Sequence, residues 1–153
     1  MVSAVRARGF TIIEMLMVVA ILGIFAGLAA PSMADLLAST AVKGAATDLY
    51  SSLIVARSEA IKRRTNATVA PVGADWTTGW TVTIGGNVFQ QVDPLKTRVA
   101  VDPTVVVPVV FGMNGRVSSG GQTFKFSDTV RTTVANRCVI VGTSGLPRVR
   151  TGC

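Results

Sequence analysis

The fold is decided by the stretch Arg6-Ala-Arg-Gly-Phe-Thr-Ile-Ile-Glu14 and by the apolar segment that follows it as far as Ala30-Pro31. Between Met15 and Ala30 the sequence has no charged residue. A charge at the centre of a membrane-spanning helix costs about 2.5–3.5 kcal/mol on insertion scales, so an acid retained there usually has a function. Glu14 is therefore a candidate functional residue. The alternative is a signal peptide or a plain anchor whose acid lies among the lipid headgroups.

The apolar segment is long enough to cross a bilayer as one helix. Residues 10–34 are predicted to form this transmembrane helix, and Gly23-x-x-x-Gly27 gives it a face on which a second helix can pack closely. Pro31 has no backbone N–H, so it is predicted to kink the helix.

Residues 1–9 are predicted to be a short leader. They are too few and too basic to form a secretory signal with its own apolar core. The leader's two arginines, Arg6 and Arg8, are predicted to stay in the cytoplasm, which places the rest of the chain across the membrane.

The motif Gly9-Phe10-Thr-Ile-Ile-Glu14 before an apolar helix resembles the class III signal of type IV pilins and type II secretion pseudopilins. In that family a prepilin peptidase cuts after the glycine and methylates the new N-terminal phenylalanine. The resemblance implies that Gly9 and Phe10 are the processing residues. It also implies that Glu14 pairs with the N-terminal amine of a neighbouring subunit during assembly, and that Pro31 is the pilin proline at the membrane boundary.

The composition is that of one apolar, basic domain with an anchor. Among 153 residues, 49% are hydrophobic, and the net charge is +7, which becomes +5 when the leader's two arginines are removed. A basic surface favours anionic partners such as nucleic acid or lipid headgroups. The alternative is charge that serves only solubility. Histidine, the commonest general base and metal ligand, does not occur in the sequence.

The two cysteines, Cys138 and Cys153, are predicted to form a disulfide. The predicted topology places both on the oxidising side of the membrane, where disulfides persist. Closing a loop of about 15 residues would contribute roughly 3 kcal/mol in the chain-entropy model. A zinc site would need a histidine or further cysteines to complete its ligands.

Residues 35–66 are predicted to continue the helix as an amphipathic half that ends near Arg63 and Arg64. Apolar residues recur here at spacings of three and four, as expected for a helix that lies on a folded domain. This stripe comprises Val42, Ala46, Leu49, Leu53, Ala56 and Ala60, flanked by Tyr50, Ile54 and Ile61.

Residues 67–153 are predicted to form a periplasmic β domain of short strands and turns. Gly85-Gly86-Asn87 is predicted as a hairpin loop, and Pro103 and Pro108 indicate edges or bulges. The predicted strands are Thr68–Val72, Trp80–Ile84, Val88–Val92, Arg98–Val101, Val105–Phe111, Thr123–Phe126, Cys138–Val141 and Arg148–Arg150. The fold class is therefore α+β, with a long kinked helix packed on a small antiparallel sheet or sandwich.

The segment Asp75-Trp76-Thr-Thr-Gly79-Trp80-Thr-Val82 resembles the W-x-x-G-W-x-V pattern of the pilin branch called GspH/FimT. In that branch a β-sandwich follows the helix, as in the pilin fold. A simpler interpretation is compatible with it, namely that the two tryptophans pack in the core around a glycine turn.

Catalysis is not predicted for this chain. The sequence has no GxSxG motif, no glycine-rich phosphate loop and no paired carboxylates. No cofactor is expected, and the mechanism is assembly and binding.

The C-terminal third is predicted to be a basic surface. The last ten residues, from Ser144 through Gly145 and Arg148 to Cys153, resemble the G-R-x-R element of FimT-like minor pilins, which is associated with DNA binding in natural transformation. Leu146 stands where the first arginine belongs, Arg148 falls on the second, and Arg150 adds a charge two residues later. The predicted DNA-binding residues are Arg131, Arg137, Arg148 and Arg150.

The sequence is thus identified as a type IV pilin-like minor subunit of the GspH/FimT kind, inserted in the bacterial inner membrane and assembled into a pilus or pseudopilus. The expected partners are other pilin subunits, prepilin peptidase, the membrane and, through phosphates, DNA. Three specific roles stay open: a type II secretion pseudopilin, a DNA receptor for uptake, and a minor pilin that primes assembly.

Overall fold

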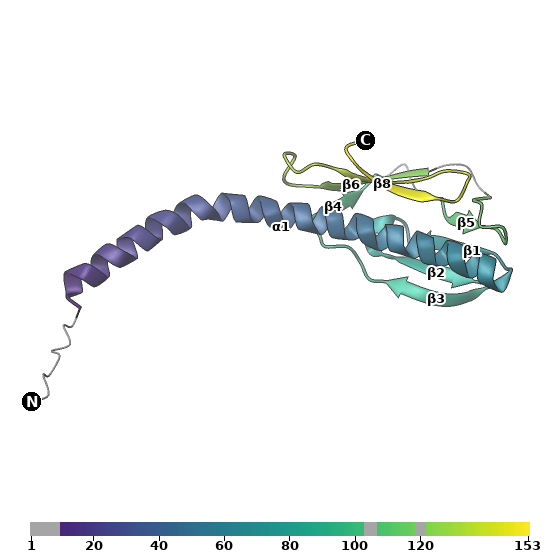
Figure 1. Cartoon of the computed structure of the whole chain (residues 1–153), viewed down its shortest axis with the longest axis horizontal. Helices are drawn as coiled ribbons and strands as arrows, with labels where there is room; N and C mark the ends of the chain where they lie inside the picture. Colours follow the sequence, from purple (N-terminus) through teal and green to yellow (C-terminus); the bar gives the residue numbers. More distant parts are fainter. Residues whose placement is uncertain (1–9, 103–106, 119–121) are drawn as a thin grey trace, which may run out of the picture. The chain divides into compact units, whose positions relative to one another are not determined.

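The computed structural model describes residues 10–102, 107–118 and 122–153, without the side chains of residues 28–31 (Figure 1). The predicted leader with Gly9 and the start of the predicted strand Val105–Phe111 lie outside the described residues. The chain divides after Leu36 into two units, of which the second, Leu37–Cys153, contains all the strands found in the described residues.

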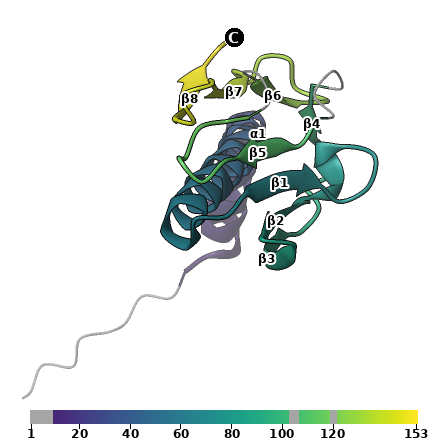
Figure 2. The ribbon, with the colours of Figure 1, turned by 90° about the vertical axis from the view of Figure 1, so that its right-hand side faces the viewer.

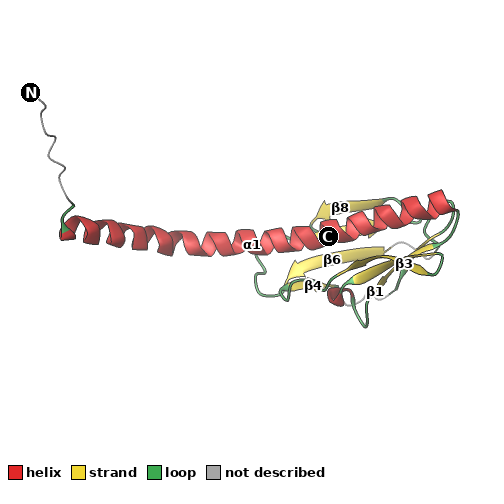
Figure 3. Cartoon of the chain, turned by 90° about the horizontal axis from the view of Figure 1, so that it is seen from below, coloured by secondary structure: helices red, strands yellow, loops and turns green. Residues whose placement is uncertain are grey.

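The long helix α1 spans Ile12–Arg63 (Figure 3). It ends where the sequence predicted, and Lys62 and Arg63 in its last turn suit the negative end of the helix dipole. The backbone at Pro31 is helical. The kink predicted there remains a prediction.

The second half of α1 packs on the strands through the predicted stripe. Leu49 and Leu53 are fully buried, as are the other predicted stripe residues, and Ala38 and Ala45 extend the stripe. They belong to one core cluster with residues from both sheets. Figure 2, which looks along the helix, shows both sheets beside this part of α1.

The first sheet has the strand order β3-β2-β1-β5 and is antiparallel throughout. Its strands are β1 (Ala67–Pro71), β2 (Trp80–Ile84), β3 (Asn87–Val92) and β5 (Val109–Phe111). The hairpin loop is one residue shorter than predicted, because Asn87 already pairs with Ile84 in β3. Gly85 and Gly86 adopt φ angles of 56° and 88°, which suit a two-residue turn between twisted strands.

The second sheet has the order β4-β6-β7-β8 and is also antiparallel. Its strands are β4 (Val99–Val101), β6 (Gln122–Asp128), β7 (Arg137–Val141) and β8 (Pro147–Thr151). Both β5 and β8 are edge strands. Pro108 directly precedes β5, as expected for a residue that cannot donate to a sheet ladder.

The two tryptophans lie in the core between the helix and the sheets. Trp76, in the short 3₁₀-helix η1 (Trp76–Thr78), is 1% exposed, and its ring meets Phe124 edge-on with centroids 4.8 Å apart. The indole N–H of Trp80 donates to the buried hydroxyl of Ser52 on α1 at 2.9 Å. Gly79 between them has φ 91°, and a Cβ there would lie 2.3 Å from the carbonyl oxygen of Val92. The predicted core role of this motif is therefore confirmed.

Candidate functional site

The first candidate site is the apolar segment at the start of α1. Every side chain from Phe10 to Gly27 is exposed in the chain by itself, including Phe10 at 81% and Ile12 at 84%. A continuous exposed apolar surface of this extent indicates contact with another protein or with a membrane. No single helix within the described residues is long and apolar enough to cross a membrane by itself, whereas Ile12–Gly27 and Ser32–Arg63 meet the length and hydropathy requirement as a pair.

Glu14 and Thr11 form a reciprocal cap at the first turn of α1. The backbone N–H of Thr11 donates to Glu14 Oε2 at 3.0 Å, and the backbone N–H of Glu14 donates to Thr11 Oγ1 at 3.3 Å. This is the capping box, in which two otherwise unpaired N–H groups are satisfied by the partner side chain. The Thr-x-x-Glu spacing before an apolar run could have revealed it from the sequence, which drew attention only to the charge of Glu14.

The second candidate site is the outer face of the second sheet. Arg150 lies opposite Cys138, which lies opposite Lys125, and Arg148 lies opposite Ile140. Directly opposed residues share a face, and so do residues two apart on a strand. Arg148, Arg150 and Lys125 therefore share the face turned away from the core. Lys125 was missed as a site residue because its place on this face, across β7 from Arg150, depends on strand register, which the sequence does not show.

The other two predicted DNA-binding residues do not share this face. Arg137 lies opposite Thr151 and Phe126, on the core-facing side, and its guanidinium donates to the hydroxyl of Thr151. Arg131 follows β6, and its backbone N–H donates to Asp128 Oδ1 at 2.7 Å. The structure thus places Arg148 and Arg150 together on the outer face and places Arg131 and Arg137 off that face.

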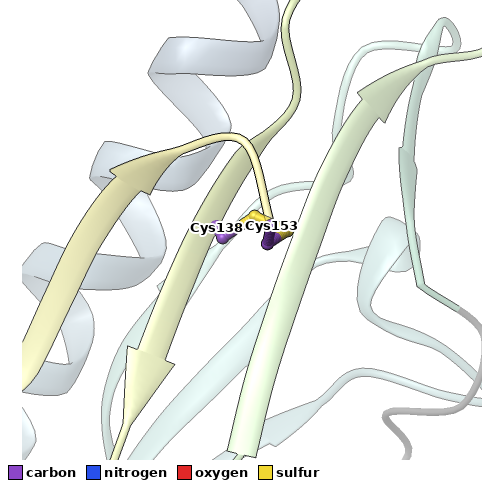
Figure 4. Close-up of a disulfide and its surroundings, with 2 residues drawn as sticks. All are labelled: Cys138 and Cys153. Carbon is purple, nitrogen blue, oxygen red and sulfur yellow. A yellow bond between two sulfur atoms is a disulfide. The ribbon is translucent and has the colours of Figure 1, made fainter.

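The disulfide between Cys138 and Cys153 fastens the end of the chain to β7 (Figure 4). The two Cα atoms are 6.1 Å apart, within the usual range for a disulfide. The predicted pairing is therefore present in the structure. It closes a loop that contains β8, so it restricts the strand that carries Arg148 and Arg150.

The acids with lowered pKa serve the fold. The pKa of Asp128 lies below its usual value mainly because its carboxylate accepts the backbone N–H of Arg131, with further help from Val130 and Arg98 and against the effect of burial. A hydrogen bond from Thr77 similarly lowers the pKa of Asp75, which caps η1. Within the described ranges, no three histidine, cysteine or acidic side chains are grouped so as to hold a metal ion.

Two family models match the chain, one at its N-terminal segment and one over most of the remainder. The model of the family described as type II transport protein GspH matches residues 45–145, and that of the prokaryotic N-terminal methylation motif matches residues 5–30. The chain belongs to the GspH family. This confirms the resemblance to pilin-like minor subunits that the sequence motifs indicated.

The fold of this GspH-family chain is similar to that of a solved minor pilin. Two crystal structures of the type IV minor pilin FimU from Pseudomonas aeruginosa strain PAO1 align with TM-scores of 0.59 and 0.58, each at 21% identity. The alignments cover 73% and 72% of this chain and 88% and 92% of the FimU chains. The α+β pilin fold with a long N-terminal helix is thereby confirmed. No curated protein sequence matches the chain.

Proposed function

We propose that this chain is a minor subunit of a type IV pilus or type II secretion pseudopilus, held in the bacterial inner membrane and assembled through its N-terminal helix. The observation that carries the proposal is the exposed apolar surface from Phe10 to Gly27 within a match to the N-terminal methylation motif. The leader stays cytoplasmic, and the β domain lies in the periplasm.

Processing prepares the helix for assembly in this proposal. Prepilin peptidase cuts between Gly9 and Phe10 and methylates the new amine of Phe10. The carboxylate of Glu14 then receives the cationic amine of a neighbouring subunit. Before that, the capping box keeps the carboxylate hydrogen-bonded at its own helix end, so it is not left without a partner in an apolar environment.

Glu14→Leu tests the assembly role. The variant should be inserted and processed like the wild type, because the apolar helix and the cleavage site are unchanged, yet it should be absent from purified filaments. The measurement is the amount of subunit in sheared filaments relative to the membrane fraction. Gly9→Val is the matched control for processing, since it should retain the leader on the membrane-bound protein. Incorporation of Glu14→Leu at the wild-type level would refute the pairing.

A second candidate function is DNA binding during uptake, for which the basic outer face of the second sheet gives specific support. The strand residues on this face include Lys125, Arg148 and Arg150 but no carboxylate. Arg148 and Arg150 are exposed, and guanidinium groups suit phosphate because they are planar and permanently charged. Binding through phosphates would be strongly dependent on salt and weakly dependent on sequence.

The DNA proposal is tested by Arg148→Gln together with Arg150→Gln. The variant should fold normally, because both side chains are exposed, and its affinity should fall with a salt slope that is smaller by about two. A control with the same loss of charge is Lys62→Gln with Arg64→Gln at the end of α1. If the double variant binds as tightly as the wild type, DNA binding at this face is excluded and the secretion pseudopilin becomes the favoured role.

A further inference from the structure

A cleft of about 510 Å³ lies between helix α1 and the edge of the second sheet. The helix contributes Lys43, Thr47 and Tyr50, and strands β7 and β8 contribute Arg137 and Arg148 among others. Figures 2 and 3 show β8 beside α1. All these residues belong to the unit Leu37–Cys153. The cleft has the volume of a small-molecule site.

The cleft is cationic. Lys43, Arg137 and Arg148 come from three different elements, and no acidic residue is among those that line it. Asp48, the nearest acid along this part of the helix, lines a separate groove with residues 90–96. The bond from Arg137 to the hydroxyl of Thr151 fixes the direction of its guanidinium. A fixed guanidinium beside a second cation, Lys43, is a site for phosphate, since less side-chain entropy is lost on binding.

Tyr50 places an aromatic ring among these cations. It is half-buried, with one part of the residue packed on the core cluster and another part lining the cleft. The sequence around the C-terminal arginines contains no aromatic residue on which a base could stack. The fold supplies one, because it brings Tyr50 to the same cleft as Arg137 and Arg148. A ring beside phosphate-binding cations is the usual arrangement for holding an unpaired base.

We propose that this cleft binds one nucleotide of a single-stranded nucleic acid, with the phosphate held by Lys43 and Arg137 and the base held against Tyr50. The inference rests on the proposed DNA-binding function and adds a preference for single strands. Arg148 lies on the edge strand β8, which borders both the outer face and the cleft, so a strand bound on the outer face continues around β8 into the cleft. The bases of a duplex are stacked on one another and do not reach Tyr50.

The test compares Tyr50→Leu with Tyr50→Phe in the detergent-solubilised full chain. Affinities for an oligothymidylate and for a duplex of equal phosphate number are measured by fluorescence anisotropy at low salt. Tyr50→Leu should weaken binding of the single strand by about 5- to 150-fold, the range for removal of one stacked base. Tyr50→Phe keeps the ring, so its affinity should stay within about twofold, and duplex binding should be the same in all three proteins.

Lys43→Gln provides a second test that does not depend on core packing, because Lys43 is exposed. It should lower the salt slope for the single strand by about one and leave the slope for the duplex unchanged. If the wild type binds both nucleic acids and neither Tyr50→Leu nor Lys43→Gln changes that binding, the proposed nucleotide site in the cleft is refuted. The outer face then remains as the DNA site. A wild-type chain that binds neither nucleic acid at low salt would overturn both proposals.

Discussion

The two halves of helix α1 differ in how far their apolar residues are buried. In the second half, eight apolar residues are buried, and five of them are alanines: Ala38, Ala45, Ala46, Ala56 and Ala60. In the first half the large residues described are all exposed, and Leu16, Leu22 and Phe25 are each more than 60% exposed. The half with the larger apolar side chains is therefore the exposed one.

This difference shows where each half finds its contacts. Alanines let the strands approach the helix backbone closely, so the second half obtains its stability within the chain. The first half has no such contacts among its described residues, which leaves a membrane or neighbouring subunits to cover it. Charge and residue size both distinguish the two halves. Between Met15 and Ala30 the sequence has no charged residue, whereas the second half is amphipathic and buries mainly alanines.

The largest expected effect is a difference in the free energy of unfolding between variants of the two halves. Leu49→Ala should lower the free energy of unfolding of the β domain by about 2–5 kcal/mol, because it leaves a cavity in the core. Leu22→Ala removes the same atoms from an exposed position and should change that free energy by less than about 0.5 kcal/mol. Urea unfolding of the full chain in detergent, followed by tryptophan fluorescence, measures both. Equal losses of unfolding free energy in the two variants would refute this difference between the buried and the exposed half.

A smaller effect is expected at the polar contact between the second half and β2. Ser52→Ala removes the acceptor of the buried Trp80 indole N–H, and the unpaired donor should lower the free energy of unfolding by about 1–3 kcal/mol. Ser51→Ala is the matched control, since Ser51 is exposed and its hydroxyl donates only to the helix carbonyl of Thr47. The same urea measurement should show little change for it. A similar loss at both serines would mean that the Trp80 contact adds nothing.

Local patterns in the sequence predicted most of the fold. The spacing of Val42, Leu49 and Leu53 identified the buried face of the helix, and alternating residues located the strands, although β6 extends beyond the predicted Thr123–Phe126 at both ends. The extension arises because Gln122 and Asp128 find pairing partners on β7 and β4. Pairing between strands depends on residues far apart in the sequence. A strand can therefore extend beyond the residues that its local pattern predicts.

The candidate sites were predicted less completely. Arg148 and Arg150 are two residues apart on one strand, so the alternation of a strand sufficed to place them together. Arg137 was expected beside them, but the register of β7 on β8 turns it toward the core-facing side. Lys125 and Tyr50 join the basic surfaces only through tertiary structure. The cap formed by Thr11 and Glu14 was readable from spacing alone and was overlooked.

Low pH should destabilise the second sheet, on which the second half of α1 packs. The pKa of Asp128 is lower in the folded chain than its usual value, chiefly because of the hydrogen bond from the backbone N–H of Arg131. Its ionised form therefore stabilises the fold fully above the unfolded pKa of about 3.9, and this contribution is lost as the pH falls through the lower folded value. Asp128→Asn should remove it. The free energy of unfolding of this variant, measured by urea titration between about pH 5 and pH 2, should fall less steeply than that of the wild type. Parallel curves would exclude Asp128 as the source.

The smallest effect compares two glycines that lie in the two halves of α1. A Cβ added at Gly44 or at Gly23 would meet nothing within 4 Å in the chain by itself. Gly44→Ala should therefore stabilise the β domain by about 0.5–1 kcal/mol, because alanine loses less backbone entropy in a helix. Gly23→Ala gains the same helix propensity but alters the Gly23-x-x-x-Gly27 face on which another helix can pack. It should leave the unfolding of the β domain unchanged and lower the amount of subunit in sheared filaments. If Gly23→Ala assembles as well as Gly44→Ala, this glycine face is not a subunit contact, and the exposed half of the helix must be covered through its larger side chains.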